Sequence, residues 1–221
     1  MTDIILTSCG RWDLLARTLK SFLEHYDLPY DRFIVNDDSG HPIPDAFRQE
    51  FPMITFFDGI HRGQVGSIDF LYSQVQNEYI MFLEDDWEFF RTGFGKASIQ
   101  VLAENPQVIQ VWLRSPNDRN GHPATGPIRK TQGNVMWQFL SATYAGGRWP
   151  GFSHNPGLKR LSDYQRLFPN GYGPVTTWNP KEPWLAESQI GKIYARARMK
   201  AATLTAGYVR HIGQNRHISH V

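Results

Sequence analysis

Short apolar runs alternate along the first half of the chain with segments whose apolar residues recur every three or four positions. The first run is Ile4-Ile5-Leu6, and the apolar residues from Leu15 to Tyr26 then follow helical spacing. We expect Asp13 to cap the start of this helix. The same alternation predicts strands at 33–35, 54–57, 79–83 and 108–113, and helices at 45–51, about 64–75 and 92–103. Strands that alternate with helices predict a mainly parallel sheet with helices on both faces.

The pattern weakens after residue 114. Residues 115–144 are rich in glycine, proline and polar side chains, and a hairpin is expected at about 126–139. Helices are expected at 163–168 and 185–199, and an extended segment at 201–209. A length of 221 residues suits one α/β domain. We therefore predict a single Rossmann-like domain with an open sheet and a small hairpin elaboration.

Charge and cysteine content narrow the class of partner. The 23 basic and 21 acidic residues are interspersed and leave a formal net charge of only +2, which disfavours nucleic acid as a partner. No apolar stretch is long enough for stable insertion into a membrane. The one cysteine, Cys9, cannot form an internal disulfide, so we expect a cytoplasmic location. No base for Cys9 is identifiable, which favours a small buried residue over a nucleophile.

Polar residues follow three of the predicted strands, at 7–11, at Asp37-Asp38 and at Glu84-Asp85-Asp86. Ligands of open α/β sheets bind outside the carboxyl ends of the strands, so these residues are expected to line one crevice. Three adjacent carboxylates repel one another unless a cation or hydrogen-bond donors occupy the site. Mg²⁺ or Mn²⁺ would relieve the repulsion and would also bind diphosphate oxygens. A solvated acidic turn is the alternative interpretation of the triplet taken alone.

Four motifs follow one another in the first half of the chain: Ile5-Leu6-Thr7-Ser8, Val35-Asn36-Asp37-Asp38-Ser39-Gly40, His61-Arg62-Gly63-Gln64-Val65-Gly66 and Glu84-Asp85-Asp86. Their order resembles the nucleotide-binding half of family-2 glycosyltransferases of the A-type fold. The resemblance covers residues 3 to about 90 well. It implies that residues 1–114 bind a nucleotide sugar and that residues 115–221 bind the acceptor.

The resemblance also implies roles for individual residues around the nucleotide. The end of the first strand and the loop after it would hold the nucleoside, and an aspartate after the second strand would contact the base. The residues implied are Thr7, Ser8 and Arg11 for the nucleoside, Asp37 or Asp38 for the base, Arg62 near the base or the diphosphate, Asp85 for the ribose and Asp86 for the metal. Glu84 departs from the first aspartate of the family's DxD motif, which leaves its ligand geometry open.

The second half resembles the family more faintly. Residues 184–191 match the place where a Glu-Asp pair begins a helix that faces the acceptor, although the pair here is Glu187-Ser188. The resemblance implies that Glu187 is the general base, and a glutamate that merely favours the helix dipole is the alternative. His211 matches a histidine that completes the metal site in some members, which would favour manganese over magnesium. A frayed tail is the alternative for His211 and for the unassigned His217 and His220.

Cationic and aromatic side chains of the second half are further candidates. Arg210 and Arg216 would neutralise a leaving diphosphate, or they serve surface solubility. Aromatic faces stack on sugar rings, although aromatic residues more often belong to the core. The candidates for stacking are Trp137, Trp149, Tyr172, Trp178 and Trp184.

These observations predict a metal-dependent transfer of a sugar from a nucleotide-diphosphate donor to a hydroxyl of a glycan or other acceptor. Direct displacement with Glu187 as base would invert the anomeric carbon. Uridine diphosphate is the favoured leaving group, from the habit of the family. A sugar nucleotidyltransferase is one alternative, although residues 7–11 carry one glycine where such enzymes have a glycine-rich loop. A non-catalytic nucleotide-sugar-binding module is the other. No GxGxxG follows the first strand, which disfavours a dinucleotide oxidoreductase.

Overall fold

A nine-stranded sheet forms the centre of the protein. The computed structural model describes residues 1–119, 121–144, 147–148, 151–177, 179, 182, 184–214 and 216. The strand order is β3-β2-β1-β4-β11-β6-β12-β8-β7. The first four strands in this order are mutually parallel: β3 (Thr55–Phe57), β2 (Tyr30–Asp37), β1 (Thr2–Ser8) and β4 (Tyr79–Glu84). This part of the sheet follows the alternation of strands and helices predicted from the sequence.

The other side of the sheet mixes directions. β11 (Gly157–Arg160) lies between β4 and β6 (Val108–Trp112) and is antiparallel to both. β12 (Lys200–Leu204) is parallel to β6. The predicted hairpin is present as β7 (Ala124–Lys130) and β8 (Met136–Leu140), and β8 continues the sheet beside β12.

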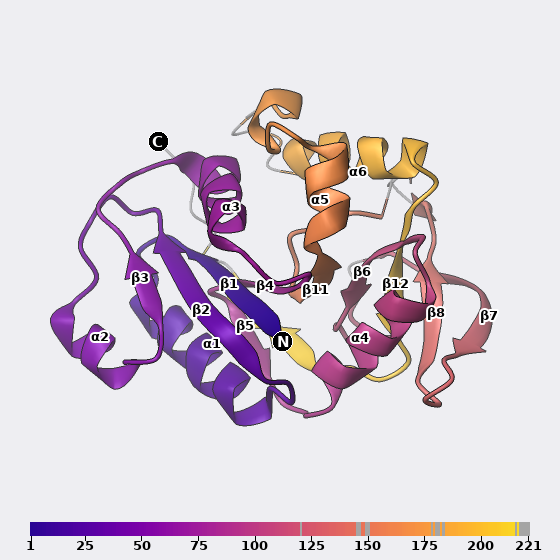
Figure 1. The fold of residues 1–221 in the computed structure, drawn as a ribbon, viewed down its shortest axis with the longest axis horizontal. Coiled ribbons are helices and arrows are strands. Elements are labelled where there is room, and N and C mark those ends of the chain that lie inside the picture. Colours follow the sequence, from indigo (N-terminus) through magenta and orange to yellow (C-terminus); the bar gives the residue numbers. More distant parts are fainter. Residues whose placement is uncertain are drawn as a thin grey trace.

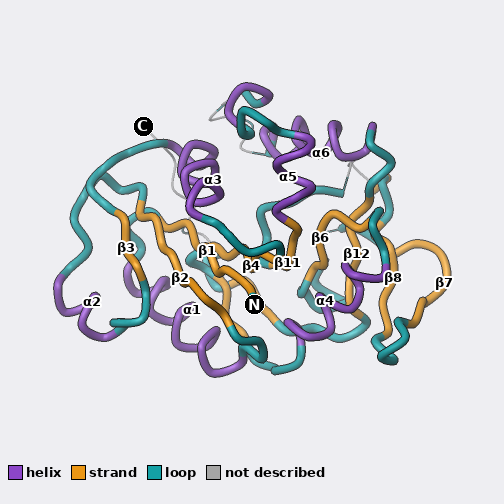
Figure 2. Tube along the Cα trace, viewed as in Figure 1, coloured by secondary structure: helices purple, strands orange, loops and turns teal. Residues whose placement is uncertain are grey.

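Helices cover both faces of the sheet, as predicted (Figure 1). Side chains alternate between the faces along each strand, so Ile4 and Leu6 of β1 belong to one buried cluster and Ile5 to the other. The first cluster packs against α1 (Trp12–His25), α2 (Asp45–Glu50) and α4 (Phe94–Glu104). The second packs against α3 (Gly63–Gln74), α5 (Leu161–Leu167) and α6 (Leu185–Arg196). The strands therefore run between two layers of helices (Figure 2).

Short elements complete the fold. β5 (Trp87–Phe89) follows the acidic triplet directly and pairs with β13 (Val209–His211) in a separate two-stranded sheet. β9 (Thr143–Tyr144) pairs with β10 (Gly147–Arg148), and a 3-10 turn, η1, spans Gly173–Val175. Within the described part of the chain, no helix combines the length and the apolar character needed to cross a bilayer.

Two differences from the sequence-based expectations concern local signals. The first is the start of α1, where Arg11 occupies the cap position and Asp13 lies inside the first turn, so the prediction of Asp13 as the cap is wrong. The second is β11, which was not expected because Pro156 and Gly157 are poor strand formers. Gly157 is needed there because a Cβ atom at this position would lie 2.4 Å from the Val111 carbonyl oxygen. This strand therefore depends on a close contact between two backbones, which no run of apolar residues marks in the sequence.

Candidate active site

The carboxyl ends of the parallel strands bring the predicted polar residues together. Thr7 at the end of β1 lies opposite Asn36 of β2 and opposite Glu84 of β4, and Ser8 lies opposite Asp37. Thr7 is partly exposed at this edge. The strand register therefore places the three sequence motifs around one end of the sheet.

Asp85 is a buried carboxylate held by the first loop. Its side chain is 1% exposed and accepts hydrogen bonds from the Ser8 hydroxyl (3.0 Å), the Arg11 Nε (3.2 Å) and the Cys9 amide (3.4 Å). Arg11 also contacts the other carboxylate oxygen through Nη2. Burial raises the pKa of Asp85 to about 6, and the charge of Arg11 opposes the rise. The predicted nucleoside-binding residues Ser8 and Arg11 thus contact the predicted ribose-binding aspartate.

Asp86 lies between the side chains of Arg11 and His211. Its Oδ2 is 2.9 Å from Arg11 Nη1 and 3.2 Å from His211 Nε2. Its backbone carbonyl accepts a hydrogen bond from the Ile212 amide at 2.8 Å. Burial raises the pKa of Asp86, but the hydrogen bond from His211 and the charge of Arg11 outweigh it and lower the pKa below its usual value. The pairing of β5 with β13 explains this contact, because it places His211 opposite Trp87.

Two residues that the sequence did not single out fix the acidic turn. Thr18 of α1 is buried, and its hydroxyl donates to the Asp85 carbonyl at 2.7 Å and accepts from the Trp87 amide at 3.1 Å. Gly213 lies so close to Asp86 that a Cβ atom there would be 2.4 Å from Oδ2. A polar residue on the apolar face of a helix is the signal that would have identified Thr18.

Glu84 is set apart from the two aspartates. It is partly exposed, and it accepts long hydrogen bonds from Gln64 Nε2 and Trp87 Nε1, both at 3.4 Å. Burial raises its pKa well above the usual value, and the negative charges of Asp86 and Glu187 add to the effect. The hydrogen-bond partners of Glu84 thus differ from those of the two aspartates, which contact Arg11.

Asp86 and His211 can hold a divalent metal jointly with a substrate. A carboxylate oxygen and an imidazole nitrogen 3.2 Å apart are both metal-ligating atoms, and this mixed set suits manganese. In the ranges that the structure describes, no three His, Cys, Asp or Glu side chains are grouped to hold a metal. The remaining ligands would therefore come from diphosphate oxygens and water, which is the usual arrangement for a metal that binds with a nucleotide.

Asp37 is committed to the turns around it. Its carboxylate is fully buried and accepts hydrogen bonds from the Gly10 amide at 2.9 Å and the Ser39 amide at 3.0 Å, and it also contacts the Ser39 hydroxyl. These contacts join the loop after β1 to the turn after β2. A role for Asp37 in contact with the base stays a prediction.

Asp38 connects the second turn to α3. Its Oδ1 accepts hydrogen bonds from the Arg62 amide at 2.5 Å and the Ser67 hydroxyl at 2.9 Å. The Arg62 guanidinium lies 4.2 Å from the centre of the Phe70 ring, in a cation–π contact. Arg62 and Asp38 therefore lie together, and their contacts with a nucleotide stay predictions.

Glu187 lies in the first turn of α6, as predicted, and is partly exposed. Its Oε1 accepts hydrogen bonds from the Ser153 hydroxyl at 3.1 Å and from the His154 amide at 2.6 Å. Burial raises the pKa of Glu187, while these two donors and the charge of Lys159 oppose the rise. A carboxylate with a raised pKa suits a general base.

The arginines near the C-terminus have different partners. Arg216 is exposed, its guanidinium pairs with both oxygens of Asp13, and its carbonyl accepts a 3.2 Å hydrogen bond from Arg11 Nη1. Arg216 thus lies beside the acidic site. Arg210 instead pairs with Glu88. Because neighbouring strand residues point to opposite faces, Arg210 lies away from the site that His211 faces.

The aromatic candidates differ in burial, and the surroundings of Cys9 affect its reactivity. Trp137 and Tyr172 belong to the core, at 2% and 0% exposure, whereas Trp184 is 56% exposed and precedes Glu187 by one helical turn. Burial and the nearby Asp37 raise the pKa of Cys9 to about 11, which disfavours a nucleophilic thiolate. Trp149, Trp178, His217 and His220 lie outside the described residues.

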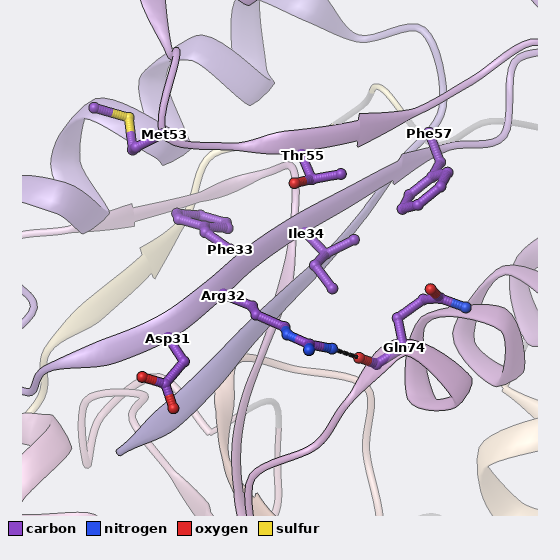
Figure 3. Close-up of a pocket in the computed structure, with 8 residues that line it drawn as sticks. All are labelled: Asp31, Arg32, Phe33, Ile34, Met53, Thr55, Phe57 and Gln74. Atoms are coloured by element: carbon purple, nitrogen blue, oxygen red, sulfur yellow. Dashed lines mark hydrogen bonds between the residues drawn. The ribbon is translucent and has the colours of Figure 1, made fainter.

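A surface pocket at the outer edge of the sheet is separate from this site. Figure 3 shows it between β2 and β3, where Arg32 donates a 2.7 Å hydrogen bond to the Gln74 carbonyl. Asp31, Met53 and Phe57 also line it. None of the predicted site residues lines this pocket, so the candidate active site rests on the contacts around the acidic triplet.

Comparison with known proteins identifies similar sequences and folds. The profile described as Glycosyl transferase family 2 matches residues 3–154. No curated protein sequence matches the chain. Three solved structures share the fold. They are mannosyltransferase PcManGT from Pyrobaculum calidifontis with GDP-Man and Mn²⁺ (TM-score 0.61, 16% identity), GalNAc-T7 with UDP, GalNAc and Mn²⁺ (0.60, 12%) and S. aureus TarS 1-349 with UDP (0.59, 12%).

Each structural match covers nearly all of this chain but a smaller share of the solved chain. They cover 97%, 96% and 94% of this chain but 58%, 43% and 59% of the respective solved chains. The chain therefore spans about half the length of the structures that it resembles. At these identities the likeness establishes the A-type glycosyltransferase fold, but it does not identify the substrate of this chain.

Proposed function

Because the chain belongs to glycosyl transferase family 2, we propose that it transfers a sugar from a nucleotide-diphosphate donor to an acceptor hydroxyl with the help of a divalent metal. The observation that carries the proposal is the arrangement around Asp86. Its Oδ2 is shared by Arg11 and His211, at 2.9 Å and 3.2 Å, at the carboxyl end of the parallel strands. A diphosphate at this position would meet a guanidinium, an imidazole and a carboxylate that suits a metal.

In this proposal the donor lies across the ends of β1, β2 and β4. Asp86 and His211 would hold manganese, or magnesium with a weaker preference, and the metal would supply positive charge to the leaving diphosphate. Arg11 and Arg216 would add further positive charge. Uridine diphosphate is the proposed leaving group. UDP is present in two of the similar structures, and GDP-Man in the third.

The acceptor side supplies the base. Oε1 of Glu187 is occupied by the Ser153 hydroxyl and the His154 amide, so Oε2 is the oxygen assigned to take the proton from the acceptor hydroxyl. The freed alkoxide attacks the anomeric carbon as the bond to the diphosphate breaks, which inverts its configuration. The exposed ring of Trp184, one turn away, is proposed to stack on an acceptor sugar.

The test is to incubate the protein with UDP-, GDP- and TDP-sugars, Mn²⁺ and a panel of saccharide acceptors. Release of the nucleoside diphosphate, inversion seen by proton NMR of the product, and loss of both in Asp86→Ala are expected. Formation of nucleoside triphosphate and sugar 1-phosphate when pyrophosphate is added to the sugar nucleotide would indicate a nucleotidyltransferase instead. Tight nucleotide binding with no release from any donor would indicate a binding module.

A further inference from the structure

Lys159 is a buried lysine that the proposed donor chemistry does not use. It belongs to β11 in the middle of the sheet and is 4% exposed. Its Nζ lies 4.4 Å from the centre of the Phe82 ring and 4.8 Å from that of Phe152. Removing an ammonium from water is costly unless partners compensate for the lost hydration. A lysine in this position therefore calls for a specific partner.

That partner is Ser153, whose hydroxyl also donates a hydrogen bond to Glu187. Lys159 Nζ donates a hydrogen bond to the Ser153 carbonyl at 3.3 Å. Gln110 lies directly opposite Lys159 on β6, and its Oε1 accepts a hydrogen bond from the Ser153 amide at 3.2 Å. Two neighbouring strand positions thus fix both backbone polar groups of Ser153. Its hydroxyl is then oriented to donate to Glu187 Oε1.

Charge connects Lys159 to the same carboxylate. Glu187 and Glu84 both favour the ammonium form of Lys159, while burial has the larger effect and lowers its pKa to about 7. The titratable groups that face Glu187 from other elements are Lys159 on β11, His154 in the segment before it and Glu84 at the end of β4. His154 is fully buried, and burial lowers its pKa well below the usual value, so it stays neutral. Among the described residues that face Glu187, Lys159 is thus the one that carries positive charge, at pH values below its pKa of about 7.

We propose that Lys159 is a positioning residue for Glu187, which it orients through Ser153 and keeps ionised by supplying the counter-charge. The inference rests on the proposed function, because it assigns Lys159 to the base of the transfer reaction. It places the control of that base on β11, the strand that the sequence pattern did not reveal.

The experiment is a pH titration of the Glu187 carboxyl carbon by ¹³C NMR, with the resonance assigned through Glu187→Gln. It compares the wild type with Lys159→Met, Lys159→Arg and Gln110→Met. Loss of the ammonium is expected to raise the Glu187 midpoint by about one pH unit or more, and Lys159→Arg should stay near the wild type. Gln110→Met is the matched control, because it removes the other hold on Ser153 without a change in charge. Its midpoint should move much less.

The same variants are then assayed for Mn²⁺-dependent release of UDP or GDP from the respective sugar nucleotides across pH. The acidic limb of the profile is expected to move up with the NMR midpoint in Lys159→Met. An unchanged Glu187 midpoint in folded Lys159→Met, or in Lys159→Gln if the first variant does not fold, would overturn the proposal. A shifted midpoint in a protein that releases no nucleotide would instead count against the proposed function and leave the role of Lys159 in the ionisation of Glu187 standing.

Discussion

The two carboxylate centres of this protein are stabilised in different ways. Asp85 and Asp86 share the cation Arg11, and His211 is in contact with Asp86. Glu187 is held by two neutral donors, the Ser153 hydroxyl and the His154 amide. The first centre has a cation, Arg11, in direct contact with its carboxylates. At the second, the cation Lys159 is connected to the carboxylate only through Ser153.

This difference suits the two proposed tasks. The hydrogen bond from His211 and the charge of Arg11 lower the pKa of Asp86, so this carboxylate can accept a metal without a change of protonation, whereas burial raises the pKa of its neighbour Asp85 to about 6. A carboxylate held by neutral donors and partly buried keeps a raised pKa, as Glu187 does, and remains basic enough to take a proton. The comparison therefore makes separate predictions for each centre.

The largest expected effect is on the acceptor side. Glu187→Gln keeps the size of the side chain and removes its basicity, so turnover should fall by about 100- to 10,000-fold. Binding of the nucleoside diphosphate, measured by calorimetry, should stay unchanged because Glu187 is hydrogen-bonded to Ser153 and His154 and not to Asp85 or Asp86. A variant that folds and retains full turnover would remove Glu187 from the mechanism.

The next effect concerns the donor side. Arg11→Met leaves two adjacent buried carboxylates without their shared cation, and the free energy of unfolding should fall by about 2 kcal/mol. Mn²⁺ should restore part of this loss and should raise the melting temperature more in the variant than in the wild type. Arg17→Met on the same helix is the control. Its exposed pair with Glu88 should contribute no more than about 1 kcal/mol. Equal stabilisation of wild type and variant by Mn²⁺ would contradict the shared position of Arg11 and the metal.

A smaller, pH-dependent effect tests whether His154, whose amide contacts Glu187, has an uncharged side chain in the folded protein. The folded-state pKa of His154 is lowered well below 6.5, so the folded protein binds fewer protons than the unfolded chain in acid. Its contribution to stability is complete above pH 6.5 and is lost below it, by up to about 1.4 kcal/mol per pH unit. Urea denaturation of wild type and His154→Phe should give parallel stabilities above pH 6.5 and a relative loss for the wild type below it. Parallel curves down to pH 5 would show that His154 becomes protonated without cost.

The smallest effect is expected at the surface. Trp184→Ala removes an exposed ring, so stability should change by less than about 0.5 kcal/mol. The KM for a saccharide acceptor should rise several-fold, while the KM for the donor stays the same. Trp137→Phe, which alters a buried ring, is the contrasting variant and should affect stability instead of acceptor affinity. An unchanged acceptor KM in Trp184→Ala would place acceptor binding elsewhere.

The grouping of polar residues at the ends of the parallel strands could be predicted because it follows from the periodicity of the chain. Apolar runs end in polar residues, and parallel strands bring those ends together, so Ser8, Arg11 and Asp85 were expected in one place and do lie in contact. The contact of Thr18 was not predicted, because its hydroxyl binds the backbone carbonyl of Asp85 and no sequence motif marks such a contact. The contact of His211 with Asp86 was implied only by the resemblance. Its cause is the short pairing of β5 with β13, which no hydrophobic pattern marks.

The surroundings of Glu187 were predicted less completely because residues that are distant in the sequence form them. Glu187 was expected at the start of a helix, but the residues that orient it come from β6 and β11 and the segment before β11. Lys159 reads as a surface residue in sequence, and only the insertion of β11 between β4 and β6 buries it. Local propensity gives no information on such an insertion, since Gly157 enables it through a close backbone contact.

The most direct test of the central claim is calorimetric titration of UDP, GDP and TDP into the protein, with and without Mn²⁺, in parallel with Asp86→Ala. The account predicts that one nucleotide binds in the presence of Mn²⁺, and that the affinity falls at least about tenfold without the metal or in the variant. Binding that is equally tight without Mn²⁺ and in Asp86→Ala would contradict the metal-bridged donor site. Failure of all three nucleotides to bind would contradict the nucleotide-sugar donor itself.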